Sequence, residues 1–550
     1  MSNEQTLNDT ALDVVIVGAG VSGLYALQHL NGLGYKVRVY EQGGDVGGTW
    51  YWNRYPGCRC DIESLEYSFS FDEELEQEWH WPERYGTQPE ILRYLNHVVD
   101  RYNLRKDIVF NCSISSATFN ENTNQWELVS KDGKRITSQF CIMATGNLST
   151  PRVPDYEDLD VFQGKWYHTG QWPHEGVDFT GLRVGVIGTG SSGVQSIPII
   201  AQQASHLNVF QRTPQFSLPA RNGPMDTEKE SLHKASYRTL REAAFNTPFG
   251  IAGYPPPTHL ALDVTPDERQ ASYEEKWAEG GSISFLYTYK DLLVDKKAND
   301  TAANFVRDKI RQTVKDQKVA EKLIPYDHPI GTKRLILDSG YFETYNRDNV
   351  TLVDIREAPI ERFTSKGLRT TDGKHYELDA VVFATGFDAM TGALSNIDLD
   401  NGAGLTIQDK WSNGPRCFMG LAMAGFPNLF MITGPQSPSV KTQMILASQQ
   451  HTDWIADFLE YMRHNGFTRF NVDQEAEDAW VIHNNDIADS TLYPLANSWY
   501  VGANVPGKPR VFMPYVGGFD RYKKACDALA RNGYPGIRLS SDIGTLSNGD

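Results

Sequence analysis

Residues 14–23 read VVIVGAGVSG, and this stretch decides the fold of the first part of the 550-residue chain. Its apolar, β-branched start predicts a buried strand, and glycines at the spacing G-x-G-x-x-G predict a tight turn into a helix. In such a unit the first glycine makes the turn, the second lets the backbone approach a pyrophosphate, and the third lets the helix pack on the strand. The positive end of the helix then faces the phosphates of a dinucleotide.

A second copy of this motif, VGVIGTGSSG, occupies residues 184–193. The two copies differ at the end of the strand that follows, because strand 37–40 leads to Glu41 and strand 207–210 leads to Arg212. A carboxylate at that place accepts hydrogen bonds from ribose hydroxyls, whereas a guanidinium pairs bidentately with a 2′-phosphate. The sequence therefore predicts FAD at the first motif and NADPH at the second, which indicates redox chemistry.

Composition and charge exclude several classes of partner. The chain has 52 Lys and Arg against 69 Asp and Glu, a net charge of −17, which argues against nucleic acid or an anionic membrane surface. Residues 1–10 lack the basic and apolar regions of a signal peptide. No apolar run approaches the ~20 residues that span a bilayer. We expect a soluble, cytoplasmic protein with no membrane anchor and no obligate protein partner.

Six cysteines are scattered at positions 58, 60, 112, 141, 417 and 526. Cys58 and Cys60 form a C-x-C, which raises the alternative of a flavin-dependent disulfide reductase, although such enzymes space their cysteine pair wider. On an extended strand, residues two apart have Cα atoms ~6.6 Å apart, near the upper limit for a disulfide. We interpret both as unpaired thiols. We predict no metal site, because no second cysteine pair or histidine cluster has metal-ligand spacing.

An apolar strand that ends in Ala-Thr-Gly occurs twice, at 140–146 and 380–386. In flavoproteins with two dinucleotide-binding units, this strand and turn mark the places where the chain crosses between domains. The sequence predicts an α/β fold with two Rossmann-like dinucleotide-binding domains and a helical insertion, in which Asp300 to Lys322 has helical spacing. We assign the FAD-binding domain to 12–146 and 386–550, the NADPH-binding domain to 147–223 and 331–385, and the helical subdomain to 224–330.

Two further segments carry a resemblance to a known family. Residues 162–173, FQGKWYHTGQWP, match position by position the F-x-G-x-x-x-H-T-x-x-W-P pattern of Baeyer–Villiger monooxygenases. A second pattern of the same family is complete in 47–50 (GGTW), 55–57 (YPG) and Asp61. The chain resembles the phenylacetone- and cyclohexanone-type members over nearly its whole length.

The resemblance implies a reaction. NADPH reduces FAD, O₂ adds to the flavin C4a to give a peroxide, and the deprotonated peroxide attacks a ketone carbonyl, after which the adduct rearranges to an ester or lactone. The family retains NADP⁺ in the site during the oxygenation. Such a protein must hold an anionic peroxide in a dry pocket beside a permanent cation. Arginine suits this task because it keeps its proton at the working pH.

The resemblance also assigns the catalytic pair. Arg334 aligns with the active-site arginine of the family, and Asp61 aligns with the acid that positions it. Lys333 is expected to help Arg212 hold the 2′-phosphate. From the residues alone, Asp61 could instead cap a helix that begins at Ile62, and both roles can coexist.

The cofactor contacts follow by position. Trp499 matches the tryptophan of a mobile loop that closes over the nicotinamide cofactor, and His168 matches a histidine at the hinge between domains, for which we expect a structural role. The expected FAD contacts are Gly18, Gly20, Ser22, Gly23, Glu41, Thr49, Trp50, Trp52, Arg59, Asp61, Tyr67, Ile114 and Met444. The expected NADPH contacts are Thr189, Gly190, Ser191, Ser192, Gly193, Gln195, Arg212, Thr213, Lys333, Arg334 and Trp499.

The substrate pocket is expected to include residues 439–444, in which Met444 forms an adaptable wall near the flavin. Lys441 departs from the apolar residue expected in an aryl-ketone enzyme of this family. Its side chain either reaches solvent with only its stem packed or alters the pocket entrance. Cys58 departs from a position that is commonly alanine. These departures leave the preferred ketone open.

Two other functions stay open from the sequence. One is a flavin monooxygenase that oxidises sulfur or nitrogen, in which serine often replaces Thr169 and the Trp172-Pro173 ending is missing. The other is a redox-sensing flavoprotein that changes conformation on reduction and has no enzymatic activity. The leading hypothesis is oxidation of a small-molecule ketone by O₂.

Overall fold

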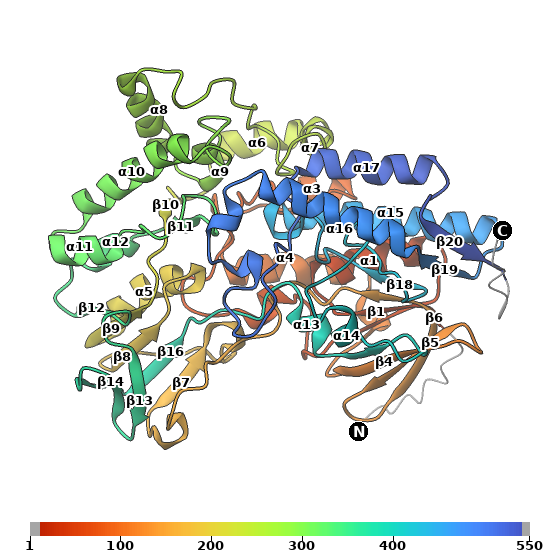
Figure 1. Cartoon of the computed structure of the whole chain (residues 1–550), viewed down its shortest axis with the longest axis horizontal. Coiled ribbons are helices and arrows are strands. Elements are labelled where there is room, and N and C mark those ends of the chain that lie inside the picture. Colours follow the sequence, from red (N-terminus) through yellow and green to blue (C-terminus); the bar gives the residue numbers. More distant parts are fainter. Residues whose placement is uncertain (1–11, 542–550) are drawn as a thin grey trace.

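The computed structural model describes residues 12–541. Our expectation about residues 1–10 therefore lies outside the described residues. Figure 1 shows two sheet-based units side by side, each with helices packed on its sheet, and a group of helices above one of them. Between residues 12 and 541, no helix combines the length and the apolar character that a membrane span requires.

The first sheet has eight strands and forms around β1 (Leu12–Val17), the strand of the first glycine motif. β1 lies between β2 (Val37–Tyr40) and β6 (Arg135–Met143) and runs parallel to both. The other strands are β3 (Ile108–Val109), β4 (Ile114–Asn120), β5 (Gln125–Ser130), β17 (Asp398–Asp400) and β18 (Leu429–Met431). Because β17 pairs with β4 and β18 pairs with β6, the sheet joins distant parts of the chain.

Two glycines allow helix α1 (Val21–Gly32) to pack closely on β1. Gly18 has a φ of +106°, and a Cβ there would lie 2.6 Å from the carbonyl oxygen of Ala144. A Cβ on Gly23 would lie 1.9 Å from the carbonyl oxygen of Gly18. Ala144 belongs to the first Ala-Thr-Gly turn, so this turn packs directly against the glycine motif.

We expect Gly23→Ala to prevent close packing of α1 on β1 and to yield a protein that binds little flavin. The added methyl group must displace backbone, and overpacking of this kind costs about 1–3 kcal/mol of the free energy of unfolding. Urea denaturation and the flavin content of the purified protein measure the two effects. Gly32→Ala, at the other end of α1, is the matched control, since nothing lies within 4 Å of its Cβ. Equal loss of stability in the two variants would contradict this prediction.

The second sheet has five parallel strands in the order β12-β9-β8-β16-β7. β8 (Arg183–Ile187) carries the second glycine motif, and α5 (Ser191–Gln203) follows it. Gly188 has a φ of +112°, and a Cβ there would lie 2.4 Å from the carbonyl oxygen of Ala384, in the second Ala-Thr-Gly turn. The other strands are β7 (Lys165–His168), β9 (His206–Gln211), β12 (Val350–Asp354) and β16 (Ala380–Phe383). The expected α/β fold with two Rossmann-like units is confirmed.

A group of helices connects β10 (Ser217–Pro219) to its parallel partner β11 (Ile336–Asp338). Within it, the expected helical stretch from Asp300 to Lys322 is two helices, α10 (Lys296–Thr313) and α11 (Gln317–Leu323). The chain breaks between them because the carboxylate of Asp316 accepts hydrogen bonds from two backbone N–H groups and starts α11. The other helices of this group are α6 (Thr227–Ala235), α7 (Tyr237–Ala244), α8 (Pro266–Glu279) and α9 (Ser282–Leu286).

The C-terminal part returns to the first unit and packs α15 (Met444–His464) against α1. An irregular segment after β18 leads to this helix, which begins at Met444. The remaining helices are α2 (Thr49–Trp52), α3 (Glu73–Glu78), α4 (Gln88–Arg101), α12 (Tyr341–Thr344), α13 (Gly392–Ser395), α14 (Ile407–Lys410), α16 (Gln474–Asp489) and α17 (Phe519–Arg531). The remaining strands are β13 (Ile360–Thr364), β14 (Gly367–Thr370), β15 (His375–Glu377), β19 (Arg469–Val472) and β20 (Ile537–Ser540).

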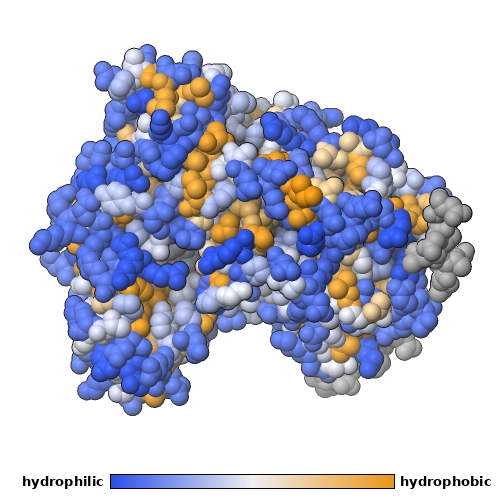
Figure 2. Space-filling model, in the orientation of Figure 1, coloured by the Kyte–Doolittle hydropathy of each residue, from blue (hydrophilic) through white to orange (hydrophobic). Residues whose placement is uncertain are grey.

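The surface agrees with the acidic composition. The face drawn in Figure 2 is largely hydrophilic, and its apolar side chains gather near the middle, where the helical group meets the two sheet-based units. The central strands are buried, as shown by Val14, Ile16 and Val186, which have no exposed area. The interior of each sheet-based unit is therefore apolar.

Candidate active site

Arg334 lies in the loop that precedes β11 and reaches two distant segments of the chain. Its Nε donates to Oδ2 of Asp61 at 2.9 Å, and its Nη2 donates to Oδ1 of the same carboxylate. Its Nη1 donates to the carbonyl oxygen of Val440 at 3.1 Å. The structure thus brings together the two residues that the resemblance pairs, and it adds a backbone acceptor from the C-terminal part.

The surroundings of Arg334 keep its positive charge. Burial by itself lowers the pKa of a guanidinium, but the carboxylate of Asp61 and then Tyr500 oppose this, and the pKa of Arg334 lies above its ordinary value. The arginine therefore cannot neutralise a neighbouring anion by giving it a proton. A fixed cation of this kind stabilises negative charge without reorganising during the reaction.

Asp61 lies in an irregular turn and not at the start of a helix. The backbone N–H of Glu66 donates to the carbonyl oxygen of Glu63 at 3.0 Å, and that of Ser64 donates to the carbonyl oxygen of Arg84 at 2.8 Å. The chain bends at residues 61–62 and forms a turn at 64–66, so no helix begins at Ile62 and the alternative interpretation of Asp61 as a helix cap is wrong. Its two carboxylate oxygens instead accept from Arg334.

The segment that carries Val440 has an unusual backbone. Thr433, Gln436 and Ser439 have φ values of +55°, +66° and +45°, in the left-handed region that residues other than glycine rarely adopt. The amide of Asn147 donates to the hydroxyl oxygens of Thr433 at 3.4 Å and Ser439 at 3.3 Å. Such conformations persist only where the surroundings hold them, and they are common at functional sites.

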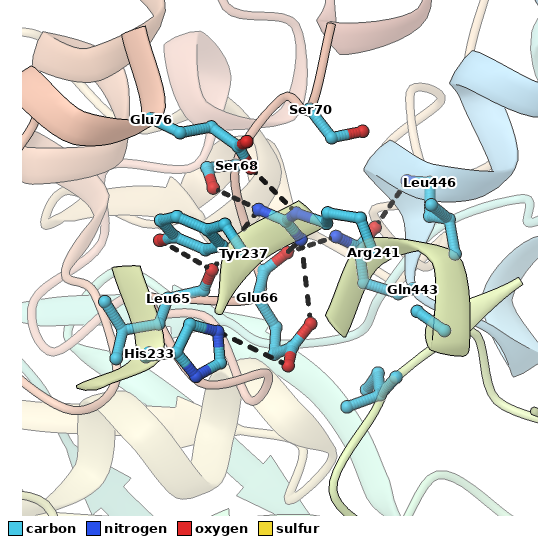
Figure 3. A network of polar contacts seen from close by, with 12 residues as sticks. Leu65, Glu66, Ser68, Ser70, Glu76, His233, Tyr237, Arg241, Gln443 and Leu446 are labelled. Atoms are coloured by element: carbon cyan, nitrogen blue, oxygen red, sulfur yellow. Dashed lines mark hydrogen bonds and ion pairs between the residues drawn. The ribbon is translucent and has the colours of Figure 1, made fainter. Parts of the chain in front are cut away.

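Figure 3 shows how the end of this segment is anchored. Nε2 of Gln443 donates to the carbonyl oxygen of Glu66 at 2.5 Å, while its Oε1 accepts from the N–H of Leu446 at 2.6 Å in the first turn of α15. The same carbonyl of Glu66 accepts from Nη1 of Arg241 at 3.0 Å, and Nε of Arg241 donates to Glu76 at 2.9 Å. Arg241 of α7 and Gln443 therefore bond to the same carbonyl oxygen, which joins the helical group and the start of α15 to the segment that follows Asp61.

The first glycine motif fits the phosphates and ribose of FAD. Helix α1 begins after Gly20, and no side chain caps its N-terminus, which leaves this positive end open to an anion. Glu41 is buried, and its two carboxylate oxygens accept from the N–H groups of Ala19 and Gly43, each at 2.7 Å. Burial raises the pKa of Glu41, and these backbone donors partly offset the rise. Each oxygen keeps a lone pair for a ribose hydroxyl.

The other expected FAD contacts lie on several elements. Nε1 of Trp50 in α2 donates to the hydroxyl of Tyr67 at 3.2 Å, and both side chains are buried. Arg59 pairs with Glu83 at 3.2 Å, and its carbonyl oxygen accepts from Nε2 of Gln195 at 3.1 Å, which links the two units. Thr49 and Trp52 lie in α2, Ile114 starts β4, Met444 starts α15, and Ser22 in α1 bonds to Ser448 at 2.8 Å.

The second glycine motif is open where a phosphate would approach. A Cβ on Gly190 would meet no atom within 4 Å, and α5 starts after it without a capping side chain. A Cβ on Gly193 would lie 2.3 Å from the carbonyl oxygen of Gly188, so the helix still packs closely on the strand. Ser191 and Ser192 form the first turn of α5. This arrangement fits a dinucleotide pyrophosphate.

Two cations lie together beside the second motif. Arg212 is exposed, and Lys333 lies 3.6 Å from the carboxylate of Asp327. Burial lowers the pKa of Lys333, Asp327 opposes this, and the charge of Arg212 lowers it further. Asp327 pairs with Lys333, and the charge of Arg212 lies near enough to act on Lys333, an arrangement that fits the 2′-phosphate of NADPH. The loop that carries Arg212 is held by Thr189, whose hydroxyl donates to the carbonyl oxygen of Thr213 at 3.0 Å.

Residues 162–173, the first family pattern, lie between the two units. The hydroxyls of Thr169 and Ser192 are 3.0 Å apart, which joins the pattern to α5. The N–H of Trp172 donates to the carbonyl oxygen of Trp52 at 3.3 Å, which joins it to α2. The first contact needs a hydroxyl residue at position 169, whereas the second uses only the backbone of Trp172.

His168 is neutral in this structure. Burial lowers its pKa to about 4, so the ring carries no charge at neutral pH. Its Nδ1 accepts from the N–H of Gly170 at 2.9 Å, and its Nε2 lies 3.3 Å from the hydroxyl of Thr385 in the second Ala-Thr-Gly turn. Both ring nitrogens are engaged in holding the chain where it crosses between the units, which supports the structural role.

Two tyrosines at this site did not follow from the sequence. Tyr500 is buried beside Trp499, with ring centroids 4.3 Å apart, in the short 3₁₀ helix η6 (Trp499–Val501). Nζ of Lys441 lies 4.4 Å from the ring centroid of Tyr493 and 4.8 Å from that of Tyr500. The only signal in the sequence was the aromatic neighbour Trp499, because the contacts join segments that are far apart in the chain.

The cysteines are free thiols. All six are buried without a disulfide, and burial raises the pKa of Cys58 to about 12. Thiols of this kind stay protonated at neutral pH and are poor nucleophiles. Within residues 12–541, no group of three or more His, Cys, Asp or Glu side chains could hold a metal ion.

Comparison with known proteins gives consistent findings. The family model described as flavin-binding monooxygenase-like matches residues 11–219. The chain is 42% identical to a 2-oxo-Δ(3)-4,5,5-trimethylcyclopentenylacetyl-CoA monooxygenase of Pseudomonas putida, over 96% of this chain and 98% of the relative. It is also 42% identical to a Baeyer–Villiger monooxygenase of Pseudooceanicola batsensis, over 96% of each chain. An oxidised steroid monooxygenase solved with bound NADP superposes with a TM-score of 0.92 at 48% identity, over 97% of this chain and 100% of that one.

Proposed function

This chain belongs to the Baeyer–Villiger monooxygenase family, and from this premise we propose that it uses NADPH and O₂ to oxidise ketones to esters or lactones. FAD and NADPH are its cofactors. The observation that carries the proposal is the permanent positive charge of Arg334, whose guanidinium donates to the carboxylate of Asp61 and to the carbonyl oxygen of Val440.

We also propose the division into an FAD-binding domain (12–146 and 386–550), an NADPH-binding domain (147–223 and 331–385) and a helical subdomain (224–330). The two separate sheets, each with its own glycine motif, support it. The expected site residues stand as proposals for the same cofactors. They are supported by the uncapped helices after Gly20 and Gly190, by Glu41, and by the pair of Arg212 and Lys333.

Bound FAD, once reduced by NADPH, supplies the activated oxygen that is inserted beside the ketone carbonyl. Arg334 places a fixed cation where negative charge develops on oxygen, and it gives up no proton. Asp61 orients the guanidinium through two parallel hydrogen bonds and sustains its charge. Tyr493 and Tyr500 are buried and lie near Arg334, whose own side chain is 33% exposed.

Incubation of the purified protein with NADPH and a panel of cyclic, aryl and aliphatic ketones tests the proposal. We expect ester or lactone products by gas chromatography, with NADPH consumption that matches product formation. A thioether and a tertiary amine in the same panel detect a sulfur- or nitrogen-oxidising enzyme. Oxidation of these two without any ester, or peroxide release with no product from a reducible flavin, would refute the ketone activity.

A further inference from the structure

Lys441 stands out among the partly or fully buried lysines. It ends the 3₁₀ helix η4 (Ser439–Lys441), next to the Val440 carbonyl that accepts from Arg334. Within residues 12–541, no carboxylate lies within ion-pair distance of its Nζ, and no hydrogen bond occupies it. By contrast, Nζ of the buried Lys410 lies 2.7 Å from Glu477, and Nζ of the buried Lys234 donates to the carbonyl oxygen of Trp79 at 2.6 Å.

Two tyrosine rings hold the ammonium group of Lys441 instead of an anion. Nζ lies 4.4 Å from the ring centroid of Tyr493 and 4.8 Å from that of Tyr500, within the range of cation–π attraction. Burial raises the pKa of both tyrosines, that of Tyr500 to about 12, so both rings are neutral at neutral pH. Ring faces attract the ammonium but accept no strong hydrogen bond from it. Its N–H groups therefore remain available to a ligand.

The charges around Lys441 do not balance. Arg334 and Lys441 are two cations, and the one carboxylate at this place, Asp61, already bonds to Arg334 through both oxygens. Cys60, behind Asp61, has a pKa raised by burial and is neutral. Burial and then the charge of Arg334 lower the pKa of Lys441 to about 7. An anion at this position would restore the protonated form, because opposite charge favours it.

We propose that Lys441 is a specificity-determining residue that makes this enzyme prefer ketones that carry a carboxylate group. The inference rests on the proposed function and names its substrate class. Arg334 remains available for the negative charge of the reacting oxygen, while the unpaired ammonium of Lys441 bonds to the carboxylate of the substrate. A neutral ketone of the same size would leave the second cation without a partner.

A matched pair of substrates tests the inference on the holoenzyme. 4-Oxocyclohexane-1-carboxylate carries the charge, and its methyl ester has nearly the same shape without it. We expect kcat/KM of the wild type to favour the acid, mainly through a lower KM, because a carboxylate contact binds ground state and transition state alike. In Lys441→Met, the ratio of kcat/KM for the acid to kcat/KM for the ester should fall by about tenfold to a hundredfold. This is the range for loss of one charge-assisted hydrogen bond.

The pH dependence provides a second readout. The substrate carboxylate stays ionised above about pH 6, whereas Lys441 loses its proton as the pH rises through about 7. The preference of the wild type for the acid should therefore decline from about pH 6.5 to about pH 9. In Lys441→Arg the preference should persist over this range, because a guanidinium keeps its proton.

Each outcome of these experiments either supports or overturns the inference. No product from either ketone would refute the proposed function, whereas products from the ester with no preference for the acid would refute only the role of Lys441. The role of Lys441 would also be overturned if Lys441→Met left the acid-to-ester ratio of kcat/KM unchanged, whether or not it raised the KM for NADPH. If Lys441→Met does not fold, judged by its flavin spectrum, the wild-type ratio and its pH dependence still decide.

Discussion

Arg334→Met abolishes ester formation while NADPH still reduces the flavin. The substitution keeps an unbranched, flexible stem but removes the cation that stabilises negative charge on oxygen. Loss of a single stabilising donor at such a site costs about a hundredfold to a thousandfold in kcat, and Arg334 supplies a full charge. Stopped-flow reduction by NADPH and gas chromatography of products measure the two steps separately.

The removal of Arg334 leaves Asp61 as an unpaired, partly buried carboxylate, which by itself destabilises the protein. The double variant Arg334→Met, Asp61→Asn removes both charges and keeps the prediction testable if the single variant is unstable. Arg369→Met is a matched control, because Arg369 also makes two bonds to one carboxylate, Glu361, at 2.7 and 2.9 Å, on the small sheet of β13 and β14. We expect normal ester formation from this control. A normal ester yield from Arg334→Met would contradict the catalytic role of Arg334.

Arg212→Ala raises the KM for NADPH far more than the KM for NADH. Only NADPH carries the 2′-phosphate, and the loss of a charge-assisted hydrogen bond to it costs about 1.5–3 kcal/mol, or about tenfold to a hundredfold in KM. Initial rates of NADPH and NADH oxidation give both constants on the same protein. Arg135→Ala, an exposed arginine on β6 of the other sheet, should change neither. Equal effects of Arg212→Ala on the two cofactors would contradict the assignment.

Lys333 lies beside Arg212 and bears on the same prediction. Because burial and the charge of Arg212 both lower the pKa of Lys333, loss of the arginine favours the protonated lysine. Lys333 then retains part of the attraction for the 2′-phosphate. We therefore expect Arg212→Ala to weaken NADPH binding without abolishing it, and the double variant with Lys333→Ala to lose the remaining preference over NADH.

The local elements of this protein were predictable because they depend on neighbours in the chain. The strand, turn and helix at 14–23 follow from apolar periodicity and from glycines that alone tolerate a φ near that of Gly18 or avoid the close contact at Gly23. The charges of Glu41 and Arg212 likewise lie at nearly the same distance along the chain from the first glycine of their motifs. The helical stretch after Asp300 was predicted with less detail, since the break at Asp316 depends on one capping side chain.

The environment of the active site was not predictable from the sequence, because it forms between segments far apart in the chain. The backbone carbonyl of Val440, which Arg334 contacts, leaves no trace in residue types. The turn at Asp61 forms in place of a helix because the N–H of Ser64 bonds to the carbonyl oxygen of Arg84. Tyr493 and Tyr500 contact Lys441 from a segment about 50 residues further along the chain, so no local pattern predicts them.

The sequence by itself determined the two dinucleotide-binding units and predicted FAD at the first and NADPH at the second, because these features depend on side-chain types at regular spacing and local backbone physics enforces that spacing. Arg334 and Asp61 were paired only through the resemblance to the family. Only the tertiary structure decided how Arg334 is held and why Lys441 has no anionic partner. Burial and the balance of charges arise when distant segments pack together, and they set the state of each ionisable group.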